Sequence, residues 1–394
     1  MTTLLDSAEA LAPELTRLRR DIHRHPELAY EEHRTAELAA RTVADLGFAV
    51  RTQVGRTGVV ADLIQGDGPV IALRADMDAL PIHEANDVPW RSSVDGVMHA
   101  CGHDAHVAML LGAARLIAEA RDAGVLPLGT VRLLFQPSEE RLDRENKSGA
   151  SRMIDEGALE GVRAIFGVHV GAHLPAGIAQ ISAGPIMAGS DVFTAAIAGH
   201  GAHAARPQEG VDAIVLAAHV IVAAQNAVAR RLAPADQGVL TIGMIRGGTA
   251  ENVVADRVFL RGTLRYYEDR VRGTLHRELR NALSVAEALG GRTRIDVQPG
   301  HPPVNNDARV TEIARAAAVN ALGESAVAPF QPDMTAEDFS QYQRITPGCF
   351  IWLGAALEDA RTHHTPRFDI DETVLPRGAA LLAACAVRAL EEVR

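Results

Sequence analysis

The sequence predicts an α/β protein: a mostly parallel, doubly wound sheet domain that carries an inserted ferredoxin-like α+β domain. Over the first half of the chain, short apolar runs alternate with amphipathic helical segments, as in parallel βαβ units. From about residue 184 the strands have one polar face and follow the order β-α-β-β-α-β. The αβ alternation returns after about residue 299. The predicted limits are therefore 1–183 with 299–394 for the larger domain and 184–298 for the insert.

The first half opens with helices and continues as buried strands separated by helices. Apolar residues recur at three-to-four spacing in ELTRLRRDIH and EEHRTAELAARTVADLG, and Gly47 ends the second segment. Strands buried on both faces are expected in VIALRAD, TVRLLFQ and AIFGVHV. Between them, helices are expected in HDAHVAMLLGAARLIAEARDAG, with Asp104 as the N-cap, and in GASRMIDEGAL.

The insert contains four expected strands, in DVFTAAIAG, GVLTIGMIRGG, DRVFLRGTLRYY and GRTRIDVQPG. In the third of these, Val258, Leu260 and Leu264 alternate with arginines, which indicates a sheet with one solvated face. Helices are expected at about 211–231 and 268–289. Beyond the insert, the pattern predicts a strand in GCFIWLGA and a closing helix in LPRGAALLAACAVRALEE.

The composition is that of a globular protein with an acidic balance. Of the 394 residues, 47% are hydrophobic and 23% are charged, and the net charge is −11 at pH 7. Nucleic-acid binders need a basic footprint, and anionic membranes attract basic segments, so neither partner is expected. The most apolar window, AIVLAAHVIVAA, is too short to span a bilayer and contains His219.

The cysteines and the amino terminus bear on the compartment. Cys101, Cys349 and Cys385 show no framework spacing, which is typical of a reducing compartment. The opening MTTLLDSAEALAPELTRLRRD has an early acidic residue and no sustained apolar core, unlike a secretory signal peptide. A cytoplasmic location is therefore expected.

Residues able to bind metals or move protons follow several of the predicted strands. They are Asp76 and Asp78 near the end of VIALRAD, Glu139 and Glu140 after TVRLLFQP, His169 at the end of AIFGVHV, Cys101 and His103 in the loop MHACGHDAH before a helix, and His363 and His364 after GCFIWLGA. Ligands of open parallel sheets bind beyond the carboxyl ends of the strands, so we expect these side chains to meet at one edge.

Taken singly, each of these residues has an ordinary explanation. A Cys-x-His pair in a loop is usually incidental, adjacent glutamates are usually a solvated turn, and a strand-end histidine usually has its hydrogen bonds satisfied. Their joint arrival at one sheet edge favours the functional interpretation. By the same reasoning, His23, His33, His99, His106 and His219 are assigned structural or surface roles.

Imidazole, thiolate and carboxylate together suit a borderline transition metal such as Zn²⁺ or Mn²⁺. The helix start after the loop is expected to favour the Cys101 thiolate. Two metals ~3.5–4 Å apart can bridge a water molecule and lower its pKa from ~15.7 toward ~7. A glutamate that does not coordinate can take the proton of that water and pass it to a leaving nitrogen. The pair Glu139 and Glu140 offers one carboxylate for each task.

A cysteine nucleophile is the alternative for the same loop. His99 and His103 lie near Cys101 in the sequence, although triad partners usually come from elsewhere in the fold. That hypothesis leaves the glutamate pair, His169 and His364 without a task, so the metal site is preferred.

These motifs resemble the M20 metallopeptidases, in particular the amidohydrolase branch with aminoacylases, hippurate hydrolases and plant indole-acetyl-amino-acid hydrolases. The resemblance covers nearly the whole chain and is carried by RRDIHRHPELAYEE, ALRADMDALPI, MHACGHDAH, FQPSEE, GHGAHAARP, GGTAENVVADRVFLRGTLR, AEDFS and HHTPRFDID. CGHDAH, followed by a glutamate pair and a late His-x-Pro, is its most specific part. The resemblance implies a two-metal catalytic domain, 1–183 with 299–394, and a lid domain, 184–298, that also forms the dimer.

The resemblance also implies roles for individual residues. The residues that match metal ligands are Cys101, His103, Glu140, His169 and His364. Glu139 matches the general base and acid, Asp78 a carboxylate that orients a ligand, and Asn252 a lid residue near the substrate. His203 matches a histidine that reaches a neighbouring active site and polarises the scissile carbonyl. Asp76 stands where other branches use a histidine ligand, which leaves its role open.

These expectations combine into a homodimeric hydrolase with two divalent transition-metal ions per chain. The ions are Mn²⁺ or Zn²⁺, and the ligand set also accepts Co²⁺ or Ni²⁺. The expected substrate is an N-acyl or N-aroyl amino acid, cleaved to a carboxylate and a free amino acid. A dipeptidase, carboxypeptidase or deaminase on the same site stays open, as does a non-catalytic homologue. The charged segment RLDRENKSGA after the glutamates departs from the family's glycine-rich turn and bears on substrate preference.

Overall fold

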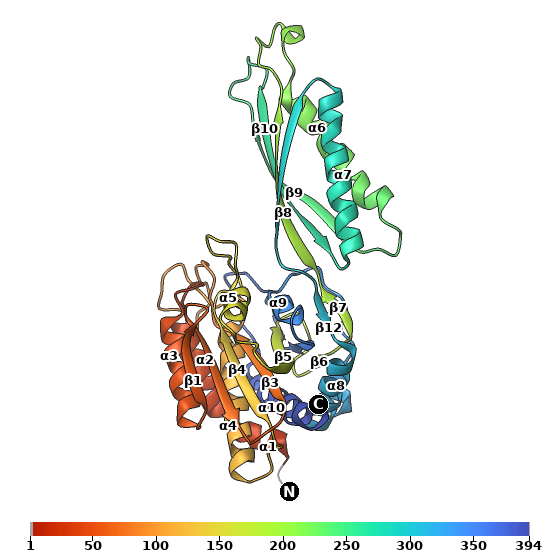
Figure 1. Cartoon of the computed structure of the whole chain (residues 1–394). Coiled ribbons are helices and arrows are strands. Elements are labelled where there is room, and N and C mark those ends of the chain that lie inside the picture. Colours follow the sequence, from red (N-terminus) through yellow and green to blue (C-terminus); the bar gives the residue numbers. More distant parts are fainter. Residues whose placement is uncertain (1–2, 394) are drawn as a thin grey trace. The chain divides into compact units, whose positions relative to one another are not determined.

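The computed structural model describes residues 3–393, and its contacts divide the chain into two compact units (Figure 1). Unit 1 consists of Met1–Ile186, Asn305–Gln331 and Asp338–Arg394, and unit 2 of Met187–Val304 and Pro332–Glu337. Residues 1, 2 and 394, which the predicted catalytic domain includes, lie outside the described residues. The lid and dimerisation roles predicted for 184–298 stay predictions.

Unit 1 is built on an eight-stranded sheet. Its strands are β1 (Ala49–Val54), β2 (Gly58–Ile64), β3 (Val70–Asp76), β4 (Thr130–Gln136), β5 (Val162–Gly171), β6 (Ala179–Gln180), β13 (Val327–Ala328) and β14 (Gly348–Gly354). The order is β1-β2-β4-β3-β5-β14-β6-β13, and the four central strands β4, β3, β5 and β14 run parallel. Strands β1, β2 and β6 each have an antiparallel neighbour. The prediction of a mostly parallel central sheet is confirmed.

The hairpin of β1 and β2 is the main element that the sequence pattern does not predict. Strand β1 is exposed at most positions, so AVRTQV lacks the apolar alternation that marks a half-buried strand. Its turn places Gly55 and Arg56 at φ 67° and 84°. Glycine adopts such angles readily whereas arginine rarely does, so the second turn residue gives no turn signal.

Helices cover both faces of this sheet. On one face lie α2 (Ala12–Arg24), α3 (His33–Asp45), α4 (His103–Asp122), α8 (Ala308–Leu322) and α10 (Leu375–Glu392), with the short α1 (Leu4–Ala10) against α10. The short helices α5 (Gly149–Asp155) and α9 (Phe339–Gln343) pack on the other face (Figure 1). Because α4 lies between the sheet, α2 and α10, it is buried on nearly every side and its first turn is held rigidly.

Helix α4 begins two residues earlier than expected, and the prediction of Asp104 as its N-cap is wrong. Gly102 occupies the N-cap position, at φ 92° and without a side-chain cap. The Asp104 carboxylate, in the first turn, lies 2.8 Å from Arg19 Nε and 2.8 Å from His23 Nδ1. A guanidinium as fully buried as that of Arg19 must be paired with carboxylates, and this requirement takes precedence over capping.

Unit 2 has the ferredoxin-like arrangement that the sequence predicts. Its elements are β8 (Gly189–Ala198), α6 (Ala213–Ala224), β9 (Gly238–Gly247), β10 (Arg257–Tyr266), α7 (Asp269–Ala288) and β11 (Arg292–Pro299). The sheet is antiparallel in the order β11-β8-β10-β9, and the two helices pack together on one face of it (Figure 1). Val258, Leu260 and Leu264 are buried in β10, as the alternation predicts. A separate two-stranded sheet joins β7 (Gly184–Met187) and β12 (Val304–Asn306), where the chain passes between the units.

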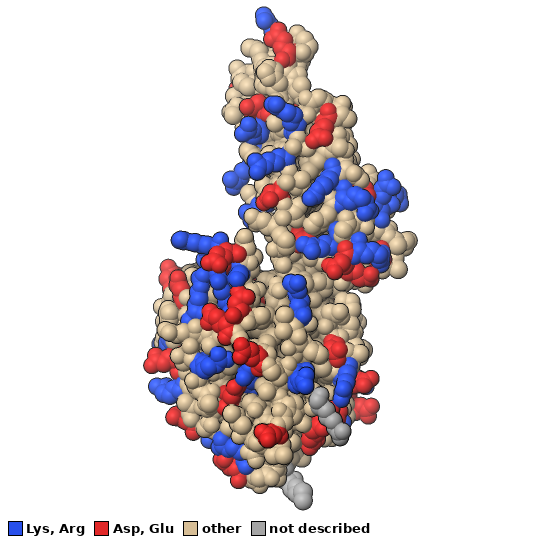
Figure 2. All heavy atoms as spheres, in the orientation of Figure 1, with Lys and Arg blue, Asp and Glu red and all other residues tan. Residues whose placement is uncertain are grey.

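Two helical segments are long and apolar enough to cross a membrane by length and composition, Ala213–Arg231 and Glu372–Glu392. The second is 72% buried as a core helix of unit 1. The first packs one side against β8, β9 and β10. Packing within unit 1 therefore accounts for the apolar surface of the second segment, whereas the first is 33% buried and keeps an exposed apolar side. Acidic and basic side chains are interspersed on the face shown in Figure 2.

Candidate dinuclear metal site

The carboxyl ends of the central strands of unit 1 deliver the candidate residues. In the parallel pair β3 and β4, Asp76 lies opposite Gln136, so Asp78 and the glutamate pair follow at the same edge. In the neighbouring pair, His169 of β5 lies opposite Trp352 of β14. The parallel register therefore brings three segments far apart in sequence to one edge of the sheet.

Cys101 is the donor around which these segments meet. Its thiol forms one group with His103 and His169, and a second group with Glu140 and His364; within each group the ligand atoms lie within 4.8 Å of one another. Cys101 Sγ is 3.6 Å from His169 Nε2, and His364 Nε2 is 3.0 Å from Glu140 Oε1. The structure thus brings all five predicted ligands together, and one thiol shared by two groups suits two neighbouring cations.

The metal loop, residues 98–106, is fixed by close backbone contacts. A Cβ on Gly102 would lie 2.3 Å from Val170 Cγ2, so only glycine lets the loop pass this close to β5. On the other side, His364 adopts φ 59° and its N–H donates to the Ala100 carbonyl at 2.8 Å. These two contacts hold the loop against the segments that carry His169 and His364.

Asp78 orients two of the candidate ligands at once. Its Oδ1 lies 3.2 Å from His103 Nδ1, and its Oδ2 accepts the Glu140 N–H at 3.0 Å. Because Nδ1 of His103 is engaged, Nε2 is left to face the donor group. Similarly, His169 Nδ1 lies 2.9 Å from the Val170 carbonyl, which leaves Nε2 toward Cys101.

Asp76 and His106 form a buried pair behind the ligands. Asp76 Oδ1 lies 2.6 Å from His106 Nδ1, and His106 Nε2 accepts the Val170 N–H at 3.0 Å. Arg74 donates to the other Asp76 oxygen at 2.7 Å. The structural role predicted for His106 agrees with these contacts. The position of Asp76 is accounted for by His106, Arg74 and His103, whose Nε2 lies 3.5 Å from Asp76 Oδ2.

The buried carboxylates of the site shift the pKa values of the neighbouring ligands and favour bound positive charge. Burial and the carboxylates of Glu140 and Glu139 raise the pKa of the Cys101 thiol well above its ordinary value. In the metal-free chain, burial and these carboxylates therefore act against the thiolate that the helix start is expected to favour. For His103, burial lowers the pKa, but Asp76, Asp78 and Glu140 raise it to about 10.

The residues present fit a pair of transition-metal ions. His103 Nε2 is buried and has no hydrogen-bond partner among the described residues, although it faces the donors. The donor set of one thiol, three imidazoles and a carboxylate is the mixture that Zn²⁺ and Mn²⁺ accept. Glu139 is 8% exposed and groups with His103 and Glu140, so a carboxylate that need not coordinate stands beside the ligands.

The two candidate residues of unit 2 lie in adjacent segments. His203 and Val253 form an isolated bridge, and the Ala204 N–H donates to the Asn252 carbonyl at 3.0 Å. Both side chains are exposed. The structure therefore brings the two motifs GHGAHAARP and ENVV together within unit 2.

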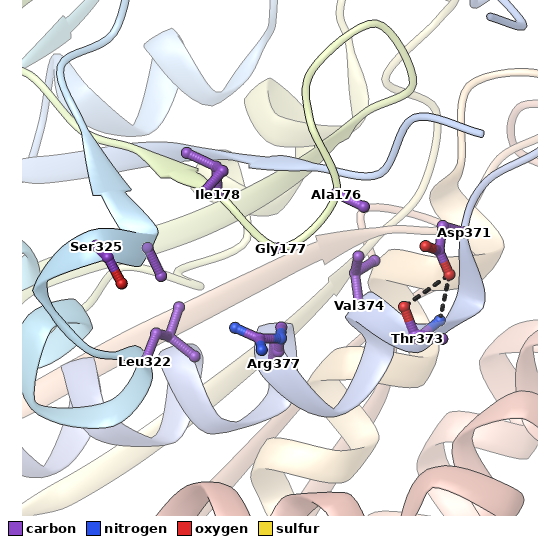
Figure 3. A pocket seen from close by; sticks show the side chains of 10 residues that line it. Ala176, Gly177, Ile178, Leu322, Ser325, Asp371, Thr373, Val374 and Arg377 are labelled. Carbon is purple, nitrogen blue, oxygen red and sulfur yellow. Dashed lines mark hydrogen bonds between the residues drawn. The ribbon is translucent and has the colours of Figure 1, made fainter. Parts of the chain in front are cut away.

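Unit 1 also contains a cavity of ≈ 420 Å³ in a different place (Figure 3). Its lining residues are Ala176, Gly177, Ile178, Leu322, Ser325, Ala326, Asp371, Thr373, Val374 and Arg377. None of the predicted site residues lines it, so it is separate from the candidate metal site.

Comparison with known proteins decides the family. Residues 72–388 match the model of peptidase family M20/M25/M40. The chain belongs to this family. It is thus a metal-dependent hydrolase that acts on C–N bonds.

Three relatives show which activities occur in this part of the M20 family. IAA-amino acid hydrolase ILR1-like 2 of Arabidopsis thaliana is 40% identical, covering 99% of this chain and 89% of the relative. N-acetyl-L-cysteine deacetylase of Bacillus subtilis is 38% identical, covering 97% and 89%. Thermostable carboxypeptidase 2 of Saccharolobus solfataricus is 37% identical, covering 95% of each.

A solved structure supports the dinuclear character of the M20 site. The YXEP protein of Bacillus subtilis, described as a dinuclear metal binding peptidase of the M20 family, superposes with a TM-score of 0.85. It is 34% identical, and the match covers 98% of this chain and 99% of that one. The two donor groups that share Cys101 agree with that description.

Sequence reasoning missed the buried charges that support this M20 site. Arg19 donates to Asp104 and Asp369 and pairs with Glu372 at 3.1 Å, while His23 lies between Asp104 and Glu84. The only sequence signal is the motif HRHPE with its preceding arginines, whose residues resemble an ordinary amphipathic helix. Ion pairs between segments 61 or more residues apart leave no local pattern.

Proposed function

We propose that this protein is a dinuclear metal amidohydrolase that releases free amino acids from N-acyl or N-aroyl amino acids. The observation that carries the proposal is the meeting of Cys101, His103, Glu140, His169 and His364 in two donor groups, with Glu139 beside them. The relatives that hydrolyse IAA-amino acid conjugates and deacetylate N-acetyl-L-cysteine support this substrate class.

In the proposed mechanism, the chain's residues divide the work of amide hydrolysis. Two cations held by Cys101, His103, Glu140, His169 and His364 would supply Lewis acidity, which would lower the pKa of water and polarise the carbonyl. Asp78 holds His103 and the Glu140 backbone in place. Glu139 accepts a proton from the attacking water and returns it to the leaving nitrogen. His203 donates a hydrogen bond to the oxygen on which negative charge develops.

The native ions are proposed to be Mn²⁺ or Zn²⁺, with Co²⁺ and Ni²⁺ accepted by the same ligands. The proposed compartment is the cytoplasm, which suits the free thiols of Cys101, Cys349 and Cys385.

A homodimer through unit 2 is proposed from its exposed apolar surface. Strand β9 is an edge strand of the described sheet, and it exposes Met244 and Ile245 at 41% and 55%. On α6, Ile214, Val215 and Val222 share the face turned away from the sheet and are 47%, 50% and 70% exposed. An open edge beside an apolar helix face is a surface that a second copy of the chain would cover.

The experiment uses chelator-stripped protein and a panel of N-acetyl, N-benzoyl and indole-acetyl amino acids. We expect no release of free amino acid without metal and restored release after addition of Mn²⁺ or Zn²⁺. If no free amino acid is released from any panel member while two ions are bound per chain, this substrate class is rejected. Silence with no ion bound would favour a non-catalytic homologue.

Carboxypeptidase activity on the same site is the second candidate, because a thermostable carboxypeptidase is 37% identical over 95% of both chains. Both reactions break an amide bond next to a free carboxylate and need the same residues. A parallel panel of free dipeptides and N-blocked dipeptides would separate the two activities by their kcat/KM values.

A further inference from the structure

Ser138, the residue before the glutamate pair, is held in an unusual backbone conformation. It is fully buried and adopts φ 47°, which residues other than glycine, asparagine and aspartate seldom adopt. The Cα–Cβ direction of Glu139 depends on this backbone turn. Whatever holds Ser138 therefore also sets the direction in which the Glu139 side chain leaves the backbone; its Oε1 in addition accepts the Asp338 N–H at 3.4 Å.

Three hydrogen bonds pin Ser138. Its N–H donates to Glu32 Oε1 at 2.9 Å, its Oγ donates to the Arg141 carbonyl at 2.7 Å, and its carbonyl accepts the Gly149 N–H at 2.9 Å. Two of these partners, Arg141 and Gly149, lie close to Ser138 in the sequence. Glu32 lies in the motif HRHPELAYEE, 106 residues earlier. Glu32 is thus the distant anchor of the turn.

Glu32 is itself fixed on all sides. It is fully buried; its Oε1 also accepts the Tyr30 N–H at 2.8 Å, and its Oε2 accepts a hydrogen bond from the Thr57 hydroxyl. All of its partners are donors, so the carboxylate has no freedom to turn away from Ser138.

The glutamate pair is therefore bracketed by two buried carboxylates. Asp78 accepts the N–H of Glu140, and Glu32 accepts the N–H of Ser138. Asp78 holds the side that carries the candidate ligand. Glu32 holds the side that leads into Glu139, and neither of its oxygens contacts a candidate ligand in the described structure.

We propose that Glu32 is a positioning residue for Glu139, acting through the strained backbone of Ser138. The inference rests on the proposed function, since it takes Glu139 as the general base. If Ser138 relaxes from φ 47°, the Glu139 carboxylate moves relative to the water it must deprotonate, and misplacement by about 1 Å can cost ~10²-fold in rate. Substrate binding does not pass through Glu139, so KM should be spared.

The test compares E32D, E32Q and the matched control E27D. The E32D variant shortens the side chain and withdraws it from Ser138, whereas E32Q keeps its length and an oxygen that can accept both N–H groups. Glu27 lies in the same motif, but it accepts the N–H groups of Arg34 and Thr35 at the start of α3 and does not contact Ser138. The measurements are kcat, KM, bound metal, thermal stability and hydrogen exchange of the Ser138 amide.

We expect E32D to lower kcat by ~10–100-fold with KM and metal content near wild type and with faster exchange at Ser138. We expect E32Q to stay within about threefold of wild-type kcat and to keep the amide protected, because the bond to Ser138 is retained. E27D should lose stability comparably without the fall in kcat. Retention of kcat by E32D despite an exposed Ser138 amide would overturn the proposal, as would an equal loss of kcat in E32Q.

Hydrogen exchange does not depend on activity, so it distinguishes a failure of this proposal from a failure of the proposed function. If the wild-type protein hydrolyses nothing in the panel, the function is rejected. The exchange rate of the Ser138 amide in E32D still decides whether Glu32 holds the turn. If this rate equals that of the wild-type protein, Glu32 does not hold the turn.

Discussion

At the residue scale, the site depends on histidines in which one ring nitrogen is hydrogen-bonded to the protein and the other is left to bind a cation. Asp78 engages Nδ1 of His103, and the Val170 carbonyl engages Nδ1 of His169, so Nε2 of each ring is left for a cation. Nε2 of His169 lies 3.6 Å from Cys101 Sγ. Imidazoles fixed in this way need no reorientation to bind a cation. The ligands are therefore preorganised by the protein alone.

Individual ligand candidates were predictable because each lies at or after a strand end or before a helix in a recognisable motif. Glu32 and Asp104 were not, because their partners, Ser138 and Arg19, lie 106 and 85 residues away in the sequence. A buried carboxylate that accepts a backbone N–H has no characteristic neighbour in the chain. Supporting residues of this kind become visible only in three dimensions.

His203 provides a prediction at this scale. H203A should lower kcat by ~10²–10³-fold, the usual effect of losing one donor to a developing oxyanion. H200A is the matched control, since His200 is an exposed histidine of the same loop. Steady-state kinetics on the best panel substrate measure both variants, and a wild-type kcat in H203A would refute the role of His203.

At the element scale, the central strands were predictable because β3, β4, β5 and β14 are continuous apolar runs, as expected for strands covered on both faces. The N-terminal hairpin was not, because β1 is exposed and its turn uses Arg56 at a positive φ. Local pattern thus fails where a strand gains its stability from pairing with a neighbour rather than from burial.

The junction of the metal loop with α4 provides a second prediction. G102A combines a strained φ of 92° with a Cβ 2.3 Å from Val170, whereas G96A shares a positive φ of 74° and opens into free space. We expect G96A to lower the free energy of unfolding by about 1 kcal/mol and G102A by roughly 3 kcal/mol. G102A should also weaken metal binding, since the added methyl displaces the loop.

Urea denaturation of the metal-stripped variants measures the free energy of unfolding, and metal titration measures the affinity for the ions. Equal stability of the two variants would show that the contact between Gly102 and β5 does not restrain the loop.

At the scale of the whole molecule, exposed apolar surface is concentrated in the smaller unit. Among residues 3–393, ten of the fifteen large hydrophobic side chains that are exposed lie in unit 2, namely Ile214, Val215, Val222, Val228, Val239, Met244, Ile245, Val253, Phe259 and Leu289. Apolar surface gathered in this way marks an interaction face and supports the proposed homodimer.

The dimer provides a third prediction, tested with two charge substitutions of equal exposure. Val222 on α6 and Val125 in unit 1 are each 70% exposed. V222E should turn the dimer into a monomer, because it buries an unpaired charge in the interface, while V125E should leave the assembly unchanged. Light scattering after size-exclusion chromatography measures the mass, and a V222E dimer would place the interface elsewhere.

The most direct test of the account is turnover and metal content measured together in E139Q, with E140Q beside it. Glutamine at 139 keeps the shape of the side chain but cannot take a proton from water. We predict two ions per chain in E139Q with turnover reduced by ~10²–10⁴-fold, and fewer bound ions in E140Q. Wild-type turnover in E139Q would contradict the account, because the base would then lie elsewhere.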